Sequence, residues 1–148
     1  MIKVKKFLSL ERATMLLFVE AFFFLGWARL LLVVMPFSKV AATLGASTQE
    51  TPHTIPNTIQ PALIQVHNAI GIVSNHTMWE SKCLVKAIAA LKMLERRRIE
   101  STLYLGAARD EQGRMIAHAW LRSGSFCVTG MEGMHRFTVV GKFAKRIT

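Results

Sequence analysis

The sequence predicts an α+β protein in which helices come first and an antiparallel sheet follows. Apolar residues recur every three or four positions over residues 62–73 and 84–94, as on the buried face of a helix. From residue 100 onward the period changes to two, and polar or glycine-containing turns separate the alternating runs. At 148 residues the chain is long enough for one domain with an appended segment.

The appended segment, residues 1–44, is expected to be hydrophobic and helical. Residues 13–37 are almost entirely apolar, but Glu20 and Arg29 interrupt them, so no charge-free window of about 18 residues suggests a spanning helix. The charged side chains do not share one face, so this helix needs cover all round. The rest of the domain, a partner protein or lipid could provide that cover. We expect Pro36 to stop or kink the helix, and the segment to remain attached because no clear cleavage site follows it.

Residues 45–61 are expected to form an extended linker, because Ser, Thr, Gln, Asn and Pro replace the apolar pattern there. The remaining residues, 62–148, would then form the main domain. Its strands are expected near residues 102–106, 115–121, 126–129 and 136–140. The first three of these strands read as an antiparallel meander, and the basic end, residues 142–146, is expected to be frayed.

The composition limits the functions that the chain can have. It contains 19 Lys and Arg against 9 Asp and Glu, a formal net charge of +10, which favours an acidic peptide, an anionic membrane surface or nucleic acid. The basic residues are scattered and not interleaved with aromatic residues, so we expect no nucleic-acid partner. The two cysteines, Cys83 and Cys127, form no metal-binding spacing and no disulfide framework. We therefore expect a reducing, cytoplasmic compartment.

A cysteine and a histidine are placed for nucleophilic catalysis. Whether the helix is capped by Thr77 or by Ser81, Cys83 lies near its N-terminal end, where free N–H groups and the dipole favour a thiolate. His118 lies on a predicted strand and could take the thiol proton and later protonate a leaving amine. A buried inert cysteine and an unrelated strand histidine are equally compatible with this spacing.

Motifs spread along the whole chain can be compared with known families. They are residues 7–12, 35–37, 82–87, 94–99, 105–106, 117–121 and 136–138. Together they resemble the leader peptidase of lasso-peptide biosynthesis, the stand-alone protease of the transglutaminase-like cysteine protease superfamily. The resemblance is weakest in the linker.

This resemblance implies a papain-like or transglutaminase-like core, in which a nucleophile helix packs on an antiparallel sheet. It implies a cysteine endopeptidase, without metal or other cofactor, that removes the leader from a ribosomally made precursor during antibiotic biosynthesis. Its partners would be the precursor peptide, a leader-binding partner protein and an asparagine-synthetase-like macrolactam cyclase. Because the hydrophobic segment lacks a polar face, we expect it to dock on the cyclase or on the inner face of the membrane.

The resemblance assigns the nucleophile to Cys83 and the base to His118. Many relatives carry Asp on the strand after the histidine, where this chain has Thr and Gly at residues 129–130, and no Asp follows. Glu132 is the nearest acidic substitute, although a backbone carbonyl or another polar side chain could orient the imidazole instead. The missing Asp leaves an alternative function, a catalytically inactive peptide-binding module of the same fold. Relatives also tend to carry glycine at the position of Arg98, where it would ease a left-handed turn.

Trp79 and Trp120 are the candidate substrate-binding residues. Trp120 is two residues from His118, so it should share the same strand face and could shield the site. Trp79 lies just before the cysteine helix. For both tryptophans a plain core role is equally compatible with the sequence.

Overall fold

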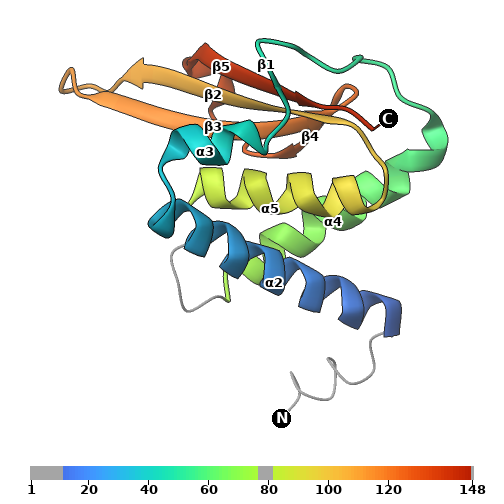
Figure 1. Ribbon diagram of the computed structural model, residues 1–148. Coiled ribbons are helices and arrows are strands. Elements are labelled where there is room, and N and C mark those ends of the chain that lie inside the picture. Colours follow the sequence, from blue (N-terminus) through green and yellow to red (C-terminus); the bar gives the residue numbers. More distant parts are fainter. Residues whose placement is uncertain (1–11, 77–81, 148) are drawn as a thin grey trace.

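A computed structural model describes residues 12–76 and 82–147, which form a layer of helices under a five-stranded sheet (Figure 1). The predicted α+β class is confirmed. In chain order the elements are α2 (Arg12–Val34), α3 (Phe37–Ala42), β1 (Ala46–Ser47), η1 (Asn57–Ile59), α4 (Gln60–Ser74), α5 (Cys83–Arg96), β2 (Ser101–Arg109), β3 (Met115–Ser123), β4 (Phe126–Thr129), η2 (Met134–Arg136) and β5 (Thr138–Lys145).

The sheet is antiparallel, with the strand order β1-β5-β2-β3-β4. A hairpin joins β2 to β3, and its turn is closed by Asp110, whose carboxylate accepts hydrogen bonds from the N–H groups of Gln112 and Arg114. After β4 the chain crosses back to pair β5 with β2, so the last strand does not continue the meander. The expectation of a frayed end is wrong, because β5 continues to Lys145 and buries Phe143 on the way.

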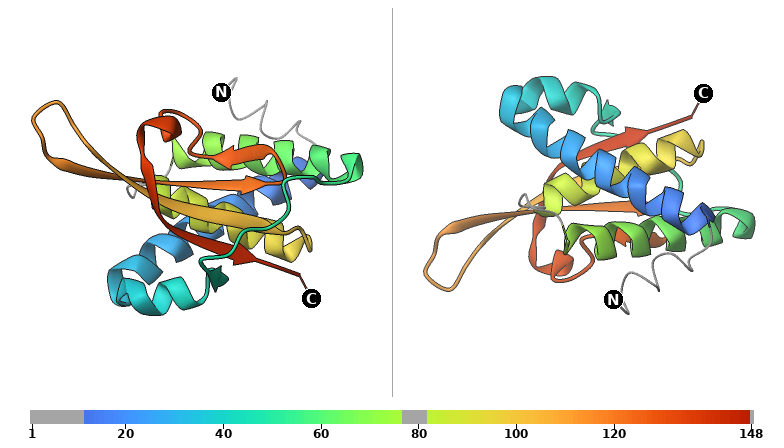
Figure 2. Two further views of the ribbon diagram at one scale, coloured as in Figure 1. Left: turned by 90° about the horizontal axis from the view of Figure 1, so that it is seen from above. Right: turned by 90° about the horizontal axis from the view of Figure 1, so that it is seen from below.

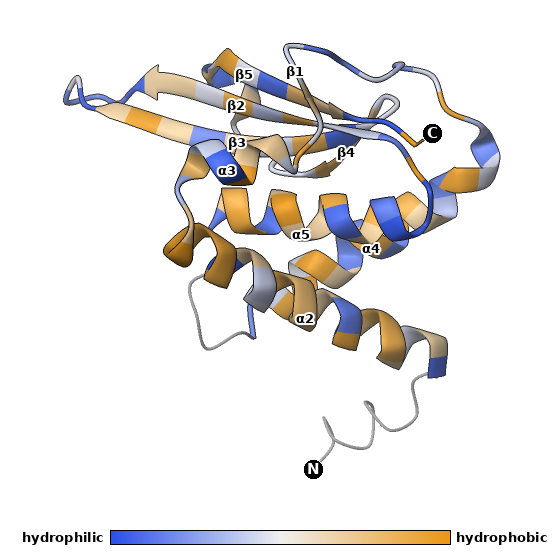
Figure 3. Cartoon of the chain, in the orientation of Figure 1, coloured by the Kyte–Doolittle hydropathy of each residue, from blue (hydrophilic) through white to orange (hydrophobic). Residues whose placement is uncertain are grey.

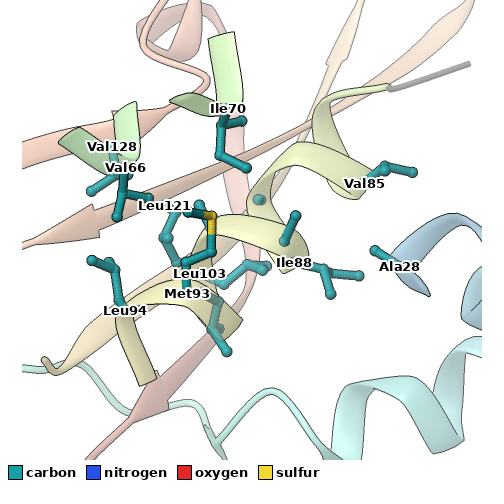
Figure 4. Packing of buried hydrophobic residues seen from close by; sticks show 14 of the residues in the cluster. Ala28, Val66, Ile70, Val85, Ile88, Met93, Leu94, Leu103, Leu121 and Val128 are labelled. Atoms are coloured by element: carbon teal, nitrogen blue, oxygen red, sulfur yellow. The ribbon is translucent and has the colours of Figure 1, made fainter. Parts of the chain in front are cut away.

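The core lies between the sheet and the helices (Figure 4). Side chains alternate along a strand, and on β2 and β3 one set, which includes Leu103 and Leu121, packs against α5. The helix contributes Ile88 and Leu94, which are fully buried. The other set, with Tyr104 and Trp120, is buried on the outer face of the sheet and is not part of this core cluster. The sheet therefore has two separately packed faces.

Helix α2 joins the same core through Ala21, Leu25 and Ala28, which are fully buried. It ends before Pro36, which is the N-cap of α3, as the sequence predicts. The carboxylate of Glu20 accepts two hydrogen bonds from the guanidinium of Arg97, at 2.6 and 2.9 Å, and one from Arg96 at 2.7 Å. The arginine run at the end of α5 therefore holds α2 in place, a role beyond its favourable interaction with the helix dipole.

Residues 57–61, expected to be part of the extended linker, form η1 and the start of α4, whereas residues 45–56 contain no helix and are bound to the sheet. This segment passes over the outer face of the sheet, where we call residues 50–52 the strap (Figure 2). Thr51 is buried, and its N–H donates to the hydroxyl of Thr102 at 2.9 Å. Arg122 donates to the carbonyl groups of Thr51 and Pro52 at 2.8 and 3.2 Å. The segments on either side of the extended region, residues 12–44 and 60–76, contribute to one core cluster.

Arg98 adopts a left-handed conformation, with φ of 57°, directly after α5. The N–H of Ile99 donates to the carbonyl of Leu94 at 2.9 Å, and that of Arg98 to Glu95 at 3.0 Å, which is a Schellman motif. A side chain in this conformation costs about 1–2 kcal/mol. The sequence comparison that places glycine here in relatives therefore has a local physical reason.

We predict that Arg98→Gly stabilises the protein by about 1 kcal/mol, since relief of the left-handed strain outweighs the added entropy of the unfolded chain. Thermal unfolding followed by circular dichroism should show a higher melting temperature than that of the wild type. Arg98→Ala is the matched control, because it removes the charge but keeps the Cβ atom and should give no gain. Equal melting temperatures for the two variants would contradict the strain argument.

Candidate active site

Cys83 is the first residue of α5, and Lys82 is its N-cap with an extended backbone. The first intrahelical bond at this end joins the N–H of Lys86 to the carbonyl of Lys82. The N–H groups of residues 83–85 therefore have no acceptor within the helix. Cys83 thus lies in the first turn, as the sequence indicates. Both caps considered from the sequence, and Trp79, fall outside the described residues.

His118 lies on β3, directly opposite Gly106 of β2. Its Nε2 atom lies 2.7 Å from the carbonyl oxygen of Gly130, the residue after β4. A carbonyl can only accept a hydrogen bond, so Nε2 carries the proton and donates it. In the neutral ring the lone pair is then on Nδ1, which is the atom available to take a proton from a thiol. The Gly130 carbonyl thus fixes the tautomer that a general base needs.

Gly130 is required at its position for two reasons. Its φ of 76° is left-handed, and a Cβ atom built there would lie 2.5 Å from the carbonyl oxygen of Ala119. A larger residue would push the chain away from β3 and carry the acceptor away from His118. The backbone acceptor is one of the three possibilities that the sequence leaves open for the missing Asp, beside Glu132 and another polar side chain.

Aromatic rings surround the His118 imidazole. Trp120 stacks on it with ring centres 5.7 Å apart and an interplanar angle of 27°, and Phe137 lies 5.1 Å away on the path to β5. A Cβ atom at Gly106 would lie 2.7 Å from Cβ of Phe137 and 2.8 Å from the Trp120 ring, so only glycine leaves room for both. Tyr104 stacks on the far side of Trp120 at 5.5 Å. These contacts restrict the orientation of the imidazole.

Trp120 shares the strand face of His118, as the alternation predicts, and it is only 7% exposed. It therefore forms a wall beside the imidazole, and its contact with a substrate stays a prediction. Glu132 is exposed in the turn before η2, whereas the Nε2 atom of His118 is bound to the Gly130 carbonyl. A role for Glu132 as the third member of a triad also stays a prediction.

The structure does not join Cys83 to His118 directly. Over residues 12–76 and 82–147 no hydrogen bond links the thiol to the imidazole. His118 belongs to the outer set of side chains with Trp120, whereas α5 packs under the sheet. Figure 1 nevertheless shows the N-terminal end of α5 below the half of the sheet from which the β2–β3 hairpin projects. Catalysis by this pair would therefore require the thiol and the imidazole to approach each other when substrate binds.

The surroundings of Cys127, the second cysteine, are those of a packed side chain. It lies half-buried on β4, and its thiol donates to the carbonyl of Thr129 at 3.2 Å. Burial raises the pKa of the Cys127 thiol, which disfavours the reactive thiolate. Of the two cysteines, Cys83 is therefore the one placed to act as a nucleophile.

The site also contains features that the sequence reasoning missed. Phe137 and the glycines at 106 and 130 shape the surroundings of the imidazole, although none of them carries a chemical group that marks a site. In the part of the chain that the structure describes, no three His, Cys, Asp or Glu side chains gather closely enough to hold a metal ion.

Comparison with known protein families gives one match. Residues 28–142 match the model of the Transglutaminase-like superfamily, from within α2 to within β5. Both Cys83 and His118 lie inside the matched region. No curated protein and no solved structure gives a significant match. The family match covers most of the chain, and the chain belongs to the transglutaminase-like superfamily.

Proposed function

We propose that this protein is a cysteine endopeptidase that removes the leader from a ribosomally made lasso-peptide precursor. The observation that carries the proposal is the hydrogen bond from Nε2 of His118 to Gly130, which leaves Nδ1 as the proton acceptor. The position of Cys83 in the first turn of α5 supports it, as does membership of a superfamily that includes cysteine proteases. The lasso-peptide role rests on the sequence motifs described above.

In the proposed reaction, Sγ of Cys83 attacks the scissile carbonyl carbon while its proton moves to Nδ1 of His118. The oxyanion would be stabilised by the free N–H groups at the start of α5. His118 then returns the proton to the departing amine as the C–N bond breaks, which leaves a thioester on Cys83. A water molecule, deprotonated by His118, then attacks the thioester carbonyl carbon. The C–S bond breaks, the leader leaves with a free carboxylate, and the proton on Nδ1 returns to Sγ of Cys83. Throughout, the Gly130 carbonyl accepts the hydrogen bond from Nε2.

The proposed partners rest on the family resemblance. The precursor is the substrate, a leader-binding partner protein presents it, and an asparagine-synthetase-like cyclase uses the freed amine to close the macrolactam. The net charge of +10 on this chain favours a precursor or partner with acidic residues.

A catalytically inactive peptide-binding module is the second candidate. The observation that favours it is the absence, among the described residues, of a hydrogen bond between Cys83 and His118. Such a module would keep the fold and the site walls but would not hydrolyse the peptide.

The two candidates are separated by incubating the full chain with a precursor and the leader-binding partner and recording mass spectra. Peptidase activity gives two products whose masses add up to that of the precursor plus one water. Peptide binding measured by fluorescence anisotropy, with intact precursor after prolonged incubation, would establish the inactive module and overturn our proposal.

A further inference from the structure

Helix α2 exposes a continuous apolar surface, which we call the α2 stripe. It consists of Leu16, Val19, Phe22, Phe23, Leu30, Val33 and Val34, whose side chains are between 49% and 64% exposed. At about 100° per residue, their directions around the helix axis fall within an arc of about 120°, so they share one face. Figure 3 shows this helix at the side of the molecule farthest from the sheet. Soluble monomers rarely expose so many large apolar side chains in one place.

In the part of the chain that the structure describes, the fully buried residues of α2 lie on the side opposite the stripe. Ala21, Leu25 and Ala28 are fully buried against the rest of the protein, and Glu20 is held by the guanidinium of Arg97. A helix that is apolar all round requires an apolar environment on every side. The structure provides that environment on one side, so the α2 stripe needs a further apolar contact.

By length and composition α2 could cross a membrane. Crossing would, however, withdraw Ala21, Leu25 and Ala28 from the core and carry Glu20 away from Arg97 into hydrocarbon, which is costly for a charged side chain. If the helix instead lies along the membrane surface, the core and the ion pair stay intact while the stripe enters the lipid. The packing therefore favours a surface orientation.

The chemistry of the stripe suits lipid better than a protein. Protein interfaces contain about one hydrogen bond per 100–200 Å², whereas none of the side chains that make up the stripe can form one. A groove of about 450 Å³ next to the stripe, between α2 and α4, has mainly apolar walls that include Phe22, Ile72 and Val73. This groove could receive part of an acyl chain.

The charges around α2 favour an anionic surface. Arg12, at the N-terminal end of the helix, and Lys39, just beyond its C-terminal end, are exposed. Three further lysines precede the helix in the sequence, at positions 3, 5 and 6, and the whole chain carries +10. Basic residues beside an apolar helix are attracted to anionic headgroups and strengthen its insertion.

We propose that the α2 stripe docks on the surface of an anionic lipid bilayer, with the helix axis parallel to the membrane. The sheet, with His118 on its outer face, would then lie on the side of the helical layer that faces away from the lipid (Figure 1). Docking depends on α2 and on charge, and does not require peptidase activity.

The proposal is tested by sedimentation of the full chain with phosphatidylcholine vesicles, with and without phosphatidylglycerol. We expect binding to the anionic vesicles that weakens as salt is raised. Phe22→Ser combined with Phe23→Ser should reduce binding by at least about tenfold, because two large side chains no longer enter the lipid. The matched control is Met115→Ser combined with Val140→Ser, which alters two residues, each 68% exposed, far from α2 in the fold.

Three results would overturn the proposal. One is equal loss of binding in both double variants, and another is equal binding of the wild type to neutral and anionic vesicles. The third is absence of vesicle binding together with a doubled mass in light scattering, which would show that a second copy covers the stripe. Circular dichroism establishes that each variant is folded, and Val19→Ser combined with Val33→Ser provides a second stripe variant.

Discussion

Cys83→Ala is expected to lower the rate of precursor cleavage by at least about 10³-fold, because no other group can form the thioester. The melting temperature should change little, because Cys83 is only partly buried and alanine is well tolerated in a first helical turn. Cleavage would be followed by mass spectrometry with the precursor and the leader-binding partner in excess. Cys127→Ala is the matched control and should retain activity, because that thiol is protonated and faces a carbonyl.

The same assay identifies the group that orients the imidazole. His118→Ala should lose as much activity as Cys83→Ala, since the thiol then has no base. Glu132→Gln should leave the rate within about twofold, because Nε2 of His118 is already bound to the Gly130 carbonyl. A large loss in Glu132→Gln would instead assign the third catalytic position to that carboxylate. Full activity in Cys83→Ala would refute the proposed mechanism altogether.

Arg122→Leu is expected to destabilise the protein by about 3 kcal/mol, the cost of removing a buried, multiply bonded charged group. The residue Arg122 is only 8% exposed, and its guanidinium donates to the hydroxyl of Tyr104 at 2.8 Å. It also donates to Gly124 at 3.1 Å and to the carbonyl groups of Thr51 and Pro52 in the strap. Leucine fills part of the volume but leaves these acceptors without their donor.

At this chain length the loss corresponds to a melting temperature lower by about 6–12 °C, which thermal unfolding monitored by circular dichroism would measure. Arg114→Leu, at an exposed position in the hairpin turn, is the matched control and should stay within about 0.5 kcal/mol of the wild type. Arg122→Lys should recover little of the loss, since a single ammonium group cannot reach the separate acceptors. An unchanged melting temperature for Arg122→Leu would show that the strap is held by other contacts.

The sequence predicts well the features that depend on the local periodicity of residues. The apolar period of α5 and the alternation along β3 are local, so they place Cys83 at a helix start and His118 on a strand. The position of β5 beside β2, and the binding of the strap by Arg122, depend on contacts between residues far apart in the chain. No local period encodes such pairings, because any strand of suitable length could satisfy the same alternation.

The candidate site shows the same difference between features set by local sequence and features set by the folded chain. The proposed nucleophile and base are chemically distinctive residues, so the sequence motifs point to both. The orienting acceptor is a main-chain atom of Gly130, and every residue carries such an atom, so its role appears only when the chain is folded. The identity of Gly130 is therefore informative only together with its φ of 76° and its close approach to Ala119.

The use of a main-chain oxygen beside His118 has a consequence for how this site tolerates mutation. A side-chain carboxylate can be deleted by one substitution, but a peptide oxygen can only be displaced. Tolerance to substitution near the group that accepts the His118 hydrogen bond should thus depend on backbone conformation. Many residues would be accepted at the exposed position 132, and few at position 130. In a saturation scan of this loop, a requirement for glycine at position 130 would identify the Gly130 carbonyl as the partner of His118.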